Sequence, residues 1–256
     1  MQWDYGQSLN CFDEVITYDK VEIAQLIKKY FDEYKDKVIF NDWLSKLDSV
    51  VLYSFIREHQ FKNIVEIGCG TSTNIMFEAL GKNNIPCKVQ SHASYETVSL
   101  NTKPECVEFE QYVGNLLDTY YDTKLKDQLK DVDLVFIDGD HESYFTTFYC
   151  YYLLEHLKPN TIVHVHDVGN PEVLAKGLAG GYLEKKYSTI CDEAYTLVQY
   201  LKLRKNFKVL CHTMDLVENN IDMISFMPDV KYDTYQLYQD APNRTTPASS
   251  LWLQKI

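Results

Sequence analysis

The stretch that most constrains the fold is Asn63–Thr73, with the sequence NIVEIGCGTST. Residues 63–67 hold three β-branched side chains in a run too short for a helix, which predicts a buried strand. Gly68 and Gly70 then allow a sharp turn, and the hydroxyl residues after them can cap a helix that continues through Leu80. This strand, glycine loop and helix suit a nucleotide-like ligand at the carboxyl end of a parallel sheet. Two glycines alone fit an ordinary tight turn equally well.

Segments with the periodicity of strands and of helices alternate along the rest of the chain. The further strands we expect are Cys87 onward, Cys106 to Phe109, Asp133 to Ile137, Thr161 to Val165, Phe207 to His212 and Asp222 to Met227. The expected helices are Val21 to Tyr34, Asp42 to His59, Lys124 to Lys130, Tyr144 to Leu157, Pro171 to Lys186 and Asp192 to Lys205. Such alternation predicts a Rossmann-like, doubly wound α/β fold, with a mostly parallel seven-stranded sheet and helices on both faces.

The same pattern divides the chain into three expected segments. Residues 1–62 form an N-terminal helical cap, residues 63–228 the α/β core, and residues 229–256 a C-terminal tail in which Trp252 and Leu253 could dock. The cap could cover a cofactor cleft, pack on a second subunit of a homo-oligomer, or close one side of the sheet. Structural cover is the interpretation we favour, and the oligomeric state stays open.

Charge and apolar content argue against two classes of partner. The net charge of -12, without a dense Lys/Arg cluster, argues against general nucleic-acid binding. No run of about 18 apolar residues exists, so we expect no membrane-spanning helix. The stretch MQWDYGQSLN lacks the basic start and the apolar run of a signal peptide. Seven cysteines without CxxC spacing fit free thiols, and a cytoplasmic protein is expected.

Titratable and metal-binding side chains gather where two neighbouring strands end. Asp138-Gly139-Asp140-His141 follows one strand, and His166-Asp167 ends the next. Because the carboxyl ends of parallel strands share one edge of a sheet, we expect Asp138 and Asp167 to converge beside the glycine loop. Two carboxylates and an imidazole there suit a divalent cation with Asp138, His166 and Asp167 as ligands.

The identity of that cation and the roles of the histidines are left open by the residues. Mg²⁺ prefers oxygen ligands, whereas the imidazole of His166 favours Mn²⁺, Fe²⁺ or another borderline metal. His166 could instead contact the ligands without binding the cation itself. Asp138 and Asp167 could simply cap helices. His141, three residues after Asp138, has the chemistry of a general base, although a structural histidine fits its position nearly as well.

Three stretches of the chain together resemble a known family. They are EIGCG at residues 66–70, LVFIDGDH at 134–141 and LKPNTIVHVHDV at 157–168. They are similar to the first motif and to the fourth and fifth strand motifs of class I S-adenosylmethionine-dependent methyltransferases. The loop form GTST, with Ser72 near where many members keep a further glycine, and the DGDH segment look most like the small-molecule O-methyltransferases. That group includes metal-dependent enzymes acting on catechols and macrolide sugars.

The resemblance implies a set of residues around the cofactor. Those near its methionine part are Glu66, Gly68 and Gly70, with Ser72 in the same loop. Asn115, after Gly114, stands where the family has an acid that contacts adenine. Glu96 would bind the ribose hydroxyls if the second strand runs that far. Asp138 would lie between cofactor and metal, and His141 would be the catalytic base.

The implied reaction is methyl transfer from S-adenosylmethionine to a hydroxyl of a small molecule such as a sugar, a phenol or a natural product. The chain departs from the family at the ligand pair, where His166 replaces a carboxylate or an amide. Two alternatives therefore stay open. One is a catalytically inactive methyltransferase-like binding module. The other is an NAD-dependent oxidoreductase, which needs the pattern GxGxxG but finds Thr73 at the third glycine.

Overall fold

The computed structural model describes residues 15–37, 44–94, 100–116, 124–139, 143–169, 190–234 and 247–256. Its centre is a seven-stranded sheet with the strand order β3-β2-β1-β4-β5-β7-β6. The strands are β1 Asn63–Ile67, β2 Cys87–Ala93, β3 Val107–Val113, β4 Leu134–Ile137, β5 Ile162–Val165, β6 Phe207–His212 and β7 Leu251–Lys255. Strands β1 to β5 pair in parallel, and β7 runs antiparallel to both of its neighbours. The expected mostly parallel seven-stranded sheet is confirmed.

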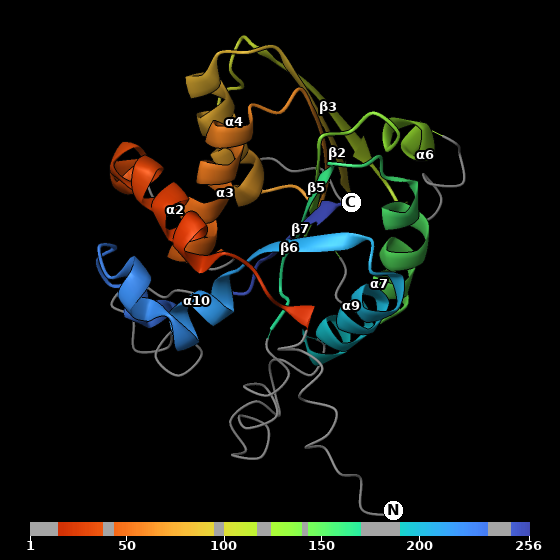
Figure 1. The fold of residues 1–256 in the computed structure, drawn as a ribbon. Coiled ribbons are helices and arrows are strands. Elements are labelled where there is room, and N and C mark those ends of the chain that lie inside the picture. The colour runs from red at the N-terminus through yellow and green to blue at the C-terminus, as the bar shows by residue number, and fades with distance from the viewer. Residues whose placement is uncertain are drawn as a thin grey trace, which may run out of the picture.

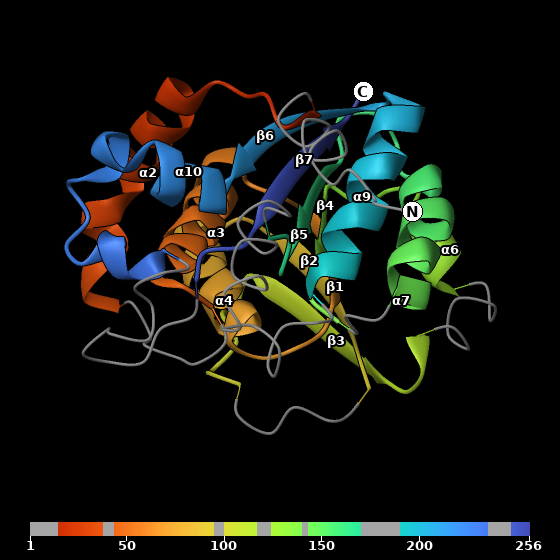
Figure 2. The same ribbon diagram turned by 90° about the horizontal axis from the view of Figure 1, so that it is seen from below.

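Helices cover both faces of this sheet (Figures 1 and 2). On one face lie α2 Lys20–Tyr34, α3 Lys46–His59, α4 Thr71–Asn83 and the short α10 Thr213–Asn219. On the other face lie α6 Lys124–Gln128, α7 Ser143–Phe148 and α9 Ile190–Arg204. The molecule is therefore a three-layer sandwich, as the alternation of strands and helices predicts.

The two faces of the sheet bury alternate residues of each strand. In β4, Leu134 and Phe136 pack in the core beneath α3 and α4, whereas Val135 and Ile137 pack in the core beneath α7 and α9. All four are buried. Successive side chains of a strand point to opposite faces, so a strand covered on both sides reads as a continuous apolar run.

Helix α3 lies between the sheet and α2. Ser45 begins it as an N-cap that accepts a hydrogen bond from the backbone N–H of Asp48 at 2.9 Å. Every residue of α3 from Leu47 to Ile56 is buried, because α2 packs on one side of it and α4 on another. A helix covered in this way contributes to the core itself.

One expected strand is wrong, and the seventh strand lies elsewhere. Residues around Asp222 to Met227 contain the 3₁₀ helix Ile221–Ile224, while β7 comes from the expected C-terminal tail. β7 inserts between β5 and β6, and its Trp252 ring stacks on Phe55 of α3 at 4.2 Å. Short apolar runs fit a strand and a buried helical turn equally well, so periodicity alone does not separate them.

Smaller differences concern where elements end. Strand β2 stops at Ala93, three residues before Glu96. The expected helix from Tyr144 to Leu157 is α7 followed by the π-helical turn Tyr149–Leu153 and a 3₁₀ turn. The helix expected over Pro171 to Lys186 lies outside the described residues. Within the described part of the chain, no helix combines the length and the apolar character needed to span a membrane.

Candidate functional site

A cavity of about 530 Å³ opens at the carboxyl ends of β1, β2 and β4, beside the turn that follows β3. The residues that line it include Gly68, Cys69, His92, Gly114, Asn115, Asp138 and Tyr144. Its volume falls in the range of about 300–1,000 Å³ that is usual for small-molecule sites. The loop residue Gly68, the predicted adenine contact Asn115 and the acid Asp138 thus share one cavity.

Gly68 brings the end of β1 against the end of β4. Its φ is +89°, and a Cβ built on it would lie 1.8 Å from the carbonyl oxygen of Asp138. The Gly68 N–H donates to the carbonyl of His92 at 2.8 Å, and the Asp138 N–H donates to the carbonyl of Ile67 at 2.8 Å. Only glycine fits this contact, which places the loop and Asp138 side by side at the cavity.

Glu66 lies beneath the glycine loop and holds the start of α4. Its buried carboxyl group accepts hydrogen bonds from the hydroxyls of Ser72 and Thr73, each at 2.9 Å. Burial raises the pKa of Glu66 to about 7. Glu66, Gly70 and Ser72 are not among the described residues that line the cavity, so their predicted contacts with a cofactor stay predictions.

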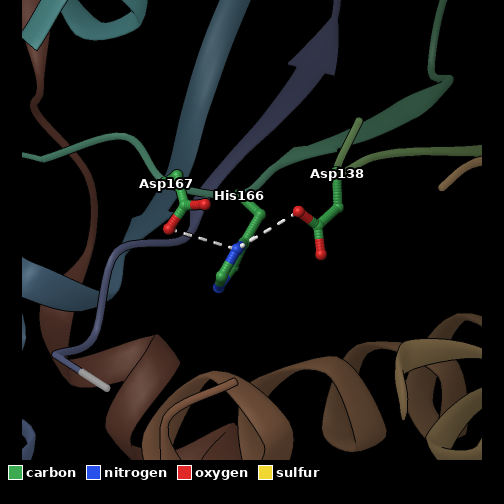
Figure 3. Close-up of side chains that lie close together, drawn as sticks. All are labelled: Asp138, His166 and Asp167. Carbon is green, nitrogen blue, oxygen red and sulfur yellow. Dashed lines mark ion pairs between the residues drawn. The ribbon is translucent and has the colours of Figure 1, made fainter. Parts of the chain in front are cut away.

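Asp138, His166 and Asp167 meet at the neighbouring strand ends (Figure 3). The imidazole Nδ1 lies 3.5 Å from Asp138 Oδ1 and 3.4 Å from Asp167 Oδ1. One potential ligand atom from each residue lies within 4.8 Å of the others. His166 is 3% exposed, and the side chains of Asp138 and Asp167 are 27% and 24% exposed. The expected convergence of the two carboxylates is confirmed.

The register of the sheet explains this meeting. Ile137 of β4 pairs with Val165 of β5, so Asp138 and His166 stand opposite each other one residue further on. Both follow the alternation that turns Phe136 toward the α3 side of the sheet. Asp167 has a φ of +58°, a left-handed conformation that ends the strand, and accepts from the Ser249 hydroxyl at 3.3 Å.

The donor set fits a divalent cation. Neither ring nitrogen of the buried His166 has a hydrogen-bond partner among the described residues. Burial lowers the pKa of His166, but the carboxylates of Asp167 and Asp138 outweigh it and raise that pKa well above its usual value. An imidazole that faces two carboxylates gives one nitrogen and two oxygen ligands, a set that Mn²⁺, Fe²⁺ and similar cations accept.

The other histidine of this strand, His164, belongs to the core. Its ring stacks on Phe136 at 4.1 Å, and its Nε2 lies 2.8 Å from the hydroxyl oxygen of Ser250. It is buried, and burial holds its pKa well below the usual value. His164 is therefore a packed core histidine.

Part of the chain matches a known protein family. Residues 65–168 match a family model described as a methyltransferase domain. This range begins in β1 and ends just after Asp167, so it contains the glycine loop, the cavity and the cluster of Asp138, His166 and Asp167. This part of the chain is therefore similar to a methyltransferase domain. No curated protein matches the chain significantly in sequence.

Several solved structures are similar to the chain at low identity. The O-methyltransferase TomG from Streptomyces achromogenes, solved with S-adenosylmethionine, is 16% identical with a TM-score of 0.43, over 82% of this chain and 91% of that one. MycE, a methyltransferase of the mycinamycin biosynthetic pathway solved with Mg and S-adenosylhomocysteine, is 11% identical with a TM-score of 0.47. That match covers 93% of this chain and 55% of MycE. Podospora anserina PaMTH1, bound to S-adenosylhomocysteine, is 14% identical with a TM-score of 0.44, over 100% and 98%. At these identities and TM-scores, the likenesses do not identify an activity or a substrate for this chain.

Two of the predicted site residues, Glu96 and His141, lie outside the described residues. Two others were missed from the sequence. His92 lines the cavity at the end of β2, where its ring stacks on Tyr112 at 4.9 Å. Asp48 of α3 lies 3.8 Å from His166 Nε2. The sequence signal for Asp48 is an acidic residue within an otherwise apolar helical segment, but an acidic residue near a helix start also fits a helix cap.

Proposed function

We propose that this chain transfers a methyl group from S-adenosylmethionine to a hydroxyl of a small molecule, which is a sugar, a phenol or a natural product. We further propose that a divalent cation, Mg²⁺ or Mn²⁺, assists the transfer and is held by Asp138, His166 and Asp167. The bond between the methyl carbon and the sulfonium sulfur breaks as the bond to the substrate oxygen forms, which leaves S-adenosylhomocysteine. The hydroxyl proton passes to a general base.

The observation that carries this proposal is the position of Asp138. Its side chain belongs to the lining of the cavity, and its Oδ1 also faces His166 in the cluster. A cofactor in the cavity and an acceptor at the cluster would therefore meet at one residue. Such a placement of two reactants is itself a large part of the catalysis of group transfer.

The residues of the chain supply three contributions. Gly68 lets the end of β1 pack against the carbonyl of Asp138, which places the loop and Asp138 together at the cavity. Asp138 lines the cavity and Asp167 lies beyond it on the other side of His166 Nδ1. A cation held by these carboxylates would lower the pKa of the acceptor hydroxyl. His141 is our candidate for accepting the proton, because a neutral imidazole suits a general base near neutral pH.

Cofactor binding is tested by calorimetry on the full chain. We expect S-adenosylmethionine and S-adenosylhomocysteine to bind with one site per chain, and NAD not to bind. The reason is that the loop has Thr73 where a dinucleotide site needs its third glycine. Binding of NAD in place of S-adenosylmethionine would contradict the proposal.

Transfer is tested with S-adenosylmethionine that carries a labelled methyl group and a panel of phenols and sugars. We expect labelled product with wild type, and a loss of about 100-fold or more after chelation or in Asp138→Ala. Asp127→Ala is the matched control, because Asp127 of α6 is exposed and pairs with Lys130, just after the end of that helix. Cofactor binding without product over the whole panel would favour an inactive binding module. Full turnover after chelation would exclude the cation.

A further inference from the structure

Asp48 places a third carboxylate against His166, on the opposite side of the ring from the cluster. Asp48 Oδ2 lies 3.8 Å from His166 Nε2, whereas Asp138 and Asp167 face Nδ1. The Asp48 side chain is fully buried in the first turn of α3. A buried carboxylate is costly unless other groups compensate its charge, so its surroundings show what it does.

Four hydrogen bonds converge on this carboxylate from three parts of the chain. Oδ1 accepts from the Thr213 hydroxyl at 2.6 Å and from the Ser250 N–H at 3.1 Å. Oδ2 accepts from the Ser45 hydroxyl at 2.8 Å and from the Ser249 N–H at 3.1 Å. Because both oxygens act as acceptors, the group is an ionised carboxylate held in one orientation.

The helix cap alone does not account for this arrangement. Capping of α3 explains the bond between Ser45 and Asp48. It does not explain why α10 and the residues before β7 also donate to Asp48, or why Oδ2 faces an imidazole nitrogen. These contacts hold a negative charge at a fixed place behind His166.

We propose that Asp48 is a positioning residue that keeps a proton on His166 Nε2, so that Nδ1 offers its lone pair to a cation between Asp138 and Asp167. The proposal rests on the cation of the proposed function. An imidazole that binds a metal has given up the proton of the binding nitrogen and carries one N–H, and the partner of the other nitrogen decides which nitrogen binds. Asp48 favours a proton on Nε2, the nitrogen that faces α3. The other nitrogen, Nδ1, then faces Asp138 and Asp167 without a proton.

The first test measures Mn²⁺ affinity of the metal-free full chain by electron paramagnetic resonance. We expect Asp48→Asn to weaken Mn²⁺ binding by about 10- to 100-fold, the usual effect of removing a residue that orients a ligand. S-adenosylhomocysteine affinity, measured by calorimetry, is expected to stay within about twofold of wild type, since Asp48 does not line the cavity.

Asp233→Asn is the matched control. Asp233 belongs to the 3₁₀ helix Val230–Asp233, and its buried carboxyl group accepts from the N–H of Leu47 in the first turn of α3 at 2.7 Å. It forms no ion pair with His166 among the described residues. We therefore expect Asp233→Asn to leave Mn²⁺ affinity unchanged even if it lowers the thermal midpoint of unfolding.

A double-mutant cycle separates positioning from a general structural effect. If Asp48 acts through His166, then Asp48→Asn has no further effect on Mn²⁺ affinity in a His166→Gln background. Additive losses in the double variant would overturn the proposal, because they would show that Asp48 acts independently of the imidazole.

The outcomes distinguish this inference from the proposed function. If folded Asp48→Asn binds Mn²⁺ as tightly as wild type does, the role of Asp48 is overturned and the methyltransferase proposal stands. Wild type that binds S-adenosylhomocysteine but no Mn²⁺ would overturn both the cation and the role of Asp48. Wild type that binds neither ligand would overturn the proposed function as well.

A second measurement on wild type serves if Asp48→Asn does not fold. Histidine labelled with ¹⁵N reports which ring nitrogen carries the proton in the Zn²⁺-loaded full chain. We expect His166 to coordinate through Nδ1 and to keep its proton on Nε2. Coordination through Nε2 would overturn the proposal.

Discussion

At the scale of single residues, Gly68 leaves no room for a side chain. Its φ of +89° is strained for other residues, and a methyl group there would meet the Asp138 carbonyl at 1.8 Å. We expect Gly68→Ala to lower the free energy of unfolding by about 3 kcal/mol, measured by urea denaturation followed by circular dichroism. Gly114→Ala is the control, since its φ is +152° but no atom lies within 4 Å of the added carbon. A loss as large at Gly114 would show that backbone strain, and not the contact, dominates.

Glu66 links stability to pH at the same loop. Burial raises its pKa from 4.5 to about 7, so the folded chain keeps a proton that the unfolded chain releases. The free energy of unfolding therefore falls as pH rises from about 4.5 to about 7, by up to about 3 kcal/mol. Glu66→Gln keeps the shape of the protonated group without titrating. We expect it to remove this slope in urea denaturation over that range, and an unchanged slope would contradict the assignment.

At the scale of elements, β7 ties the sheet to α3 through Trp252. The ring is fully buried, and it stacks on Phe55 at 4.2 Å with an interplanar angle of 7°. We expect Trp252→Ala to lower the free energy of unfolding by about 4 kcal/mol, measured by denaturant titration. Trp252→Phe is expected to cost much less, because the indole N–H has no hydrogen-bond partner among the described residues. Ile256→Ala, at a side chain that is 64% exposed, is the near-neutral control.

Elements with a strong local signal could be predicted, and β7 could not. β1 and β4 are runs of β-branched and other apolar residues, and their expected ranges match the structure within one residue. The strand expected around Asp222 and the true strand Leu251–Lys255 are both short apolar runs. What separates them is long-range pairing with β5 and β6, which local periodicity does not contain.

At the scale of the whole molecule, part of the site follows from topology. The carboxyl ends of parallel strands share an edge, which is sufficient to predict that Asp138 and Asp167 converge. Their roles as metal ligands, and the role of His141 as a base, stay predictions. Asp48 could not be placed beforehand, because strand alternation gives the face on which His166 points but not which helix covers that face. The expected cap helices thus supply a residue of the site as well as cover.

The insertion of β7 between β5 and β6 sets the order in which the chain can mature during synthesis. A ribosome releases β5 and β6 well before residues 249–255, so the nascent sheet has a gap where β7 belongs. Until the gap is filled, the carboxylate of Asp48 lacks the two backbone donors that come from Ser249 and Ser250. The surroundings of His166 are therefore complete only once residues 249–255 have joined the sheet.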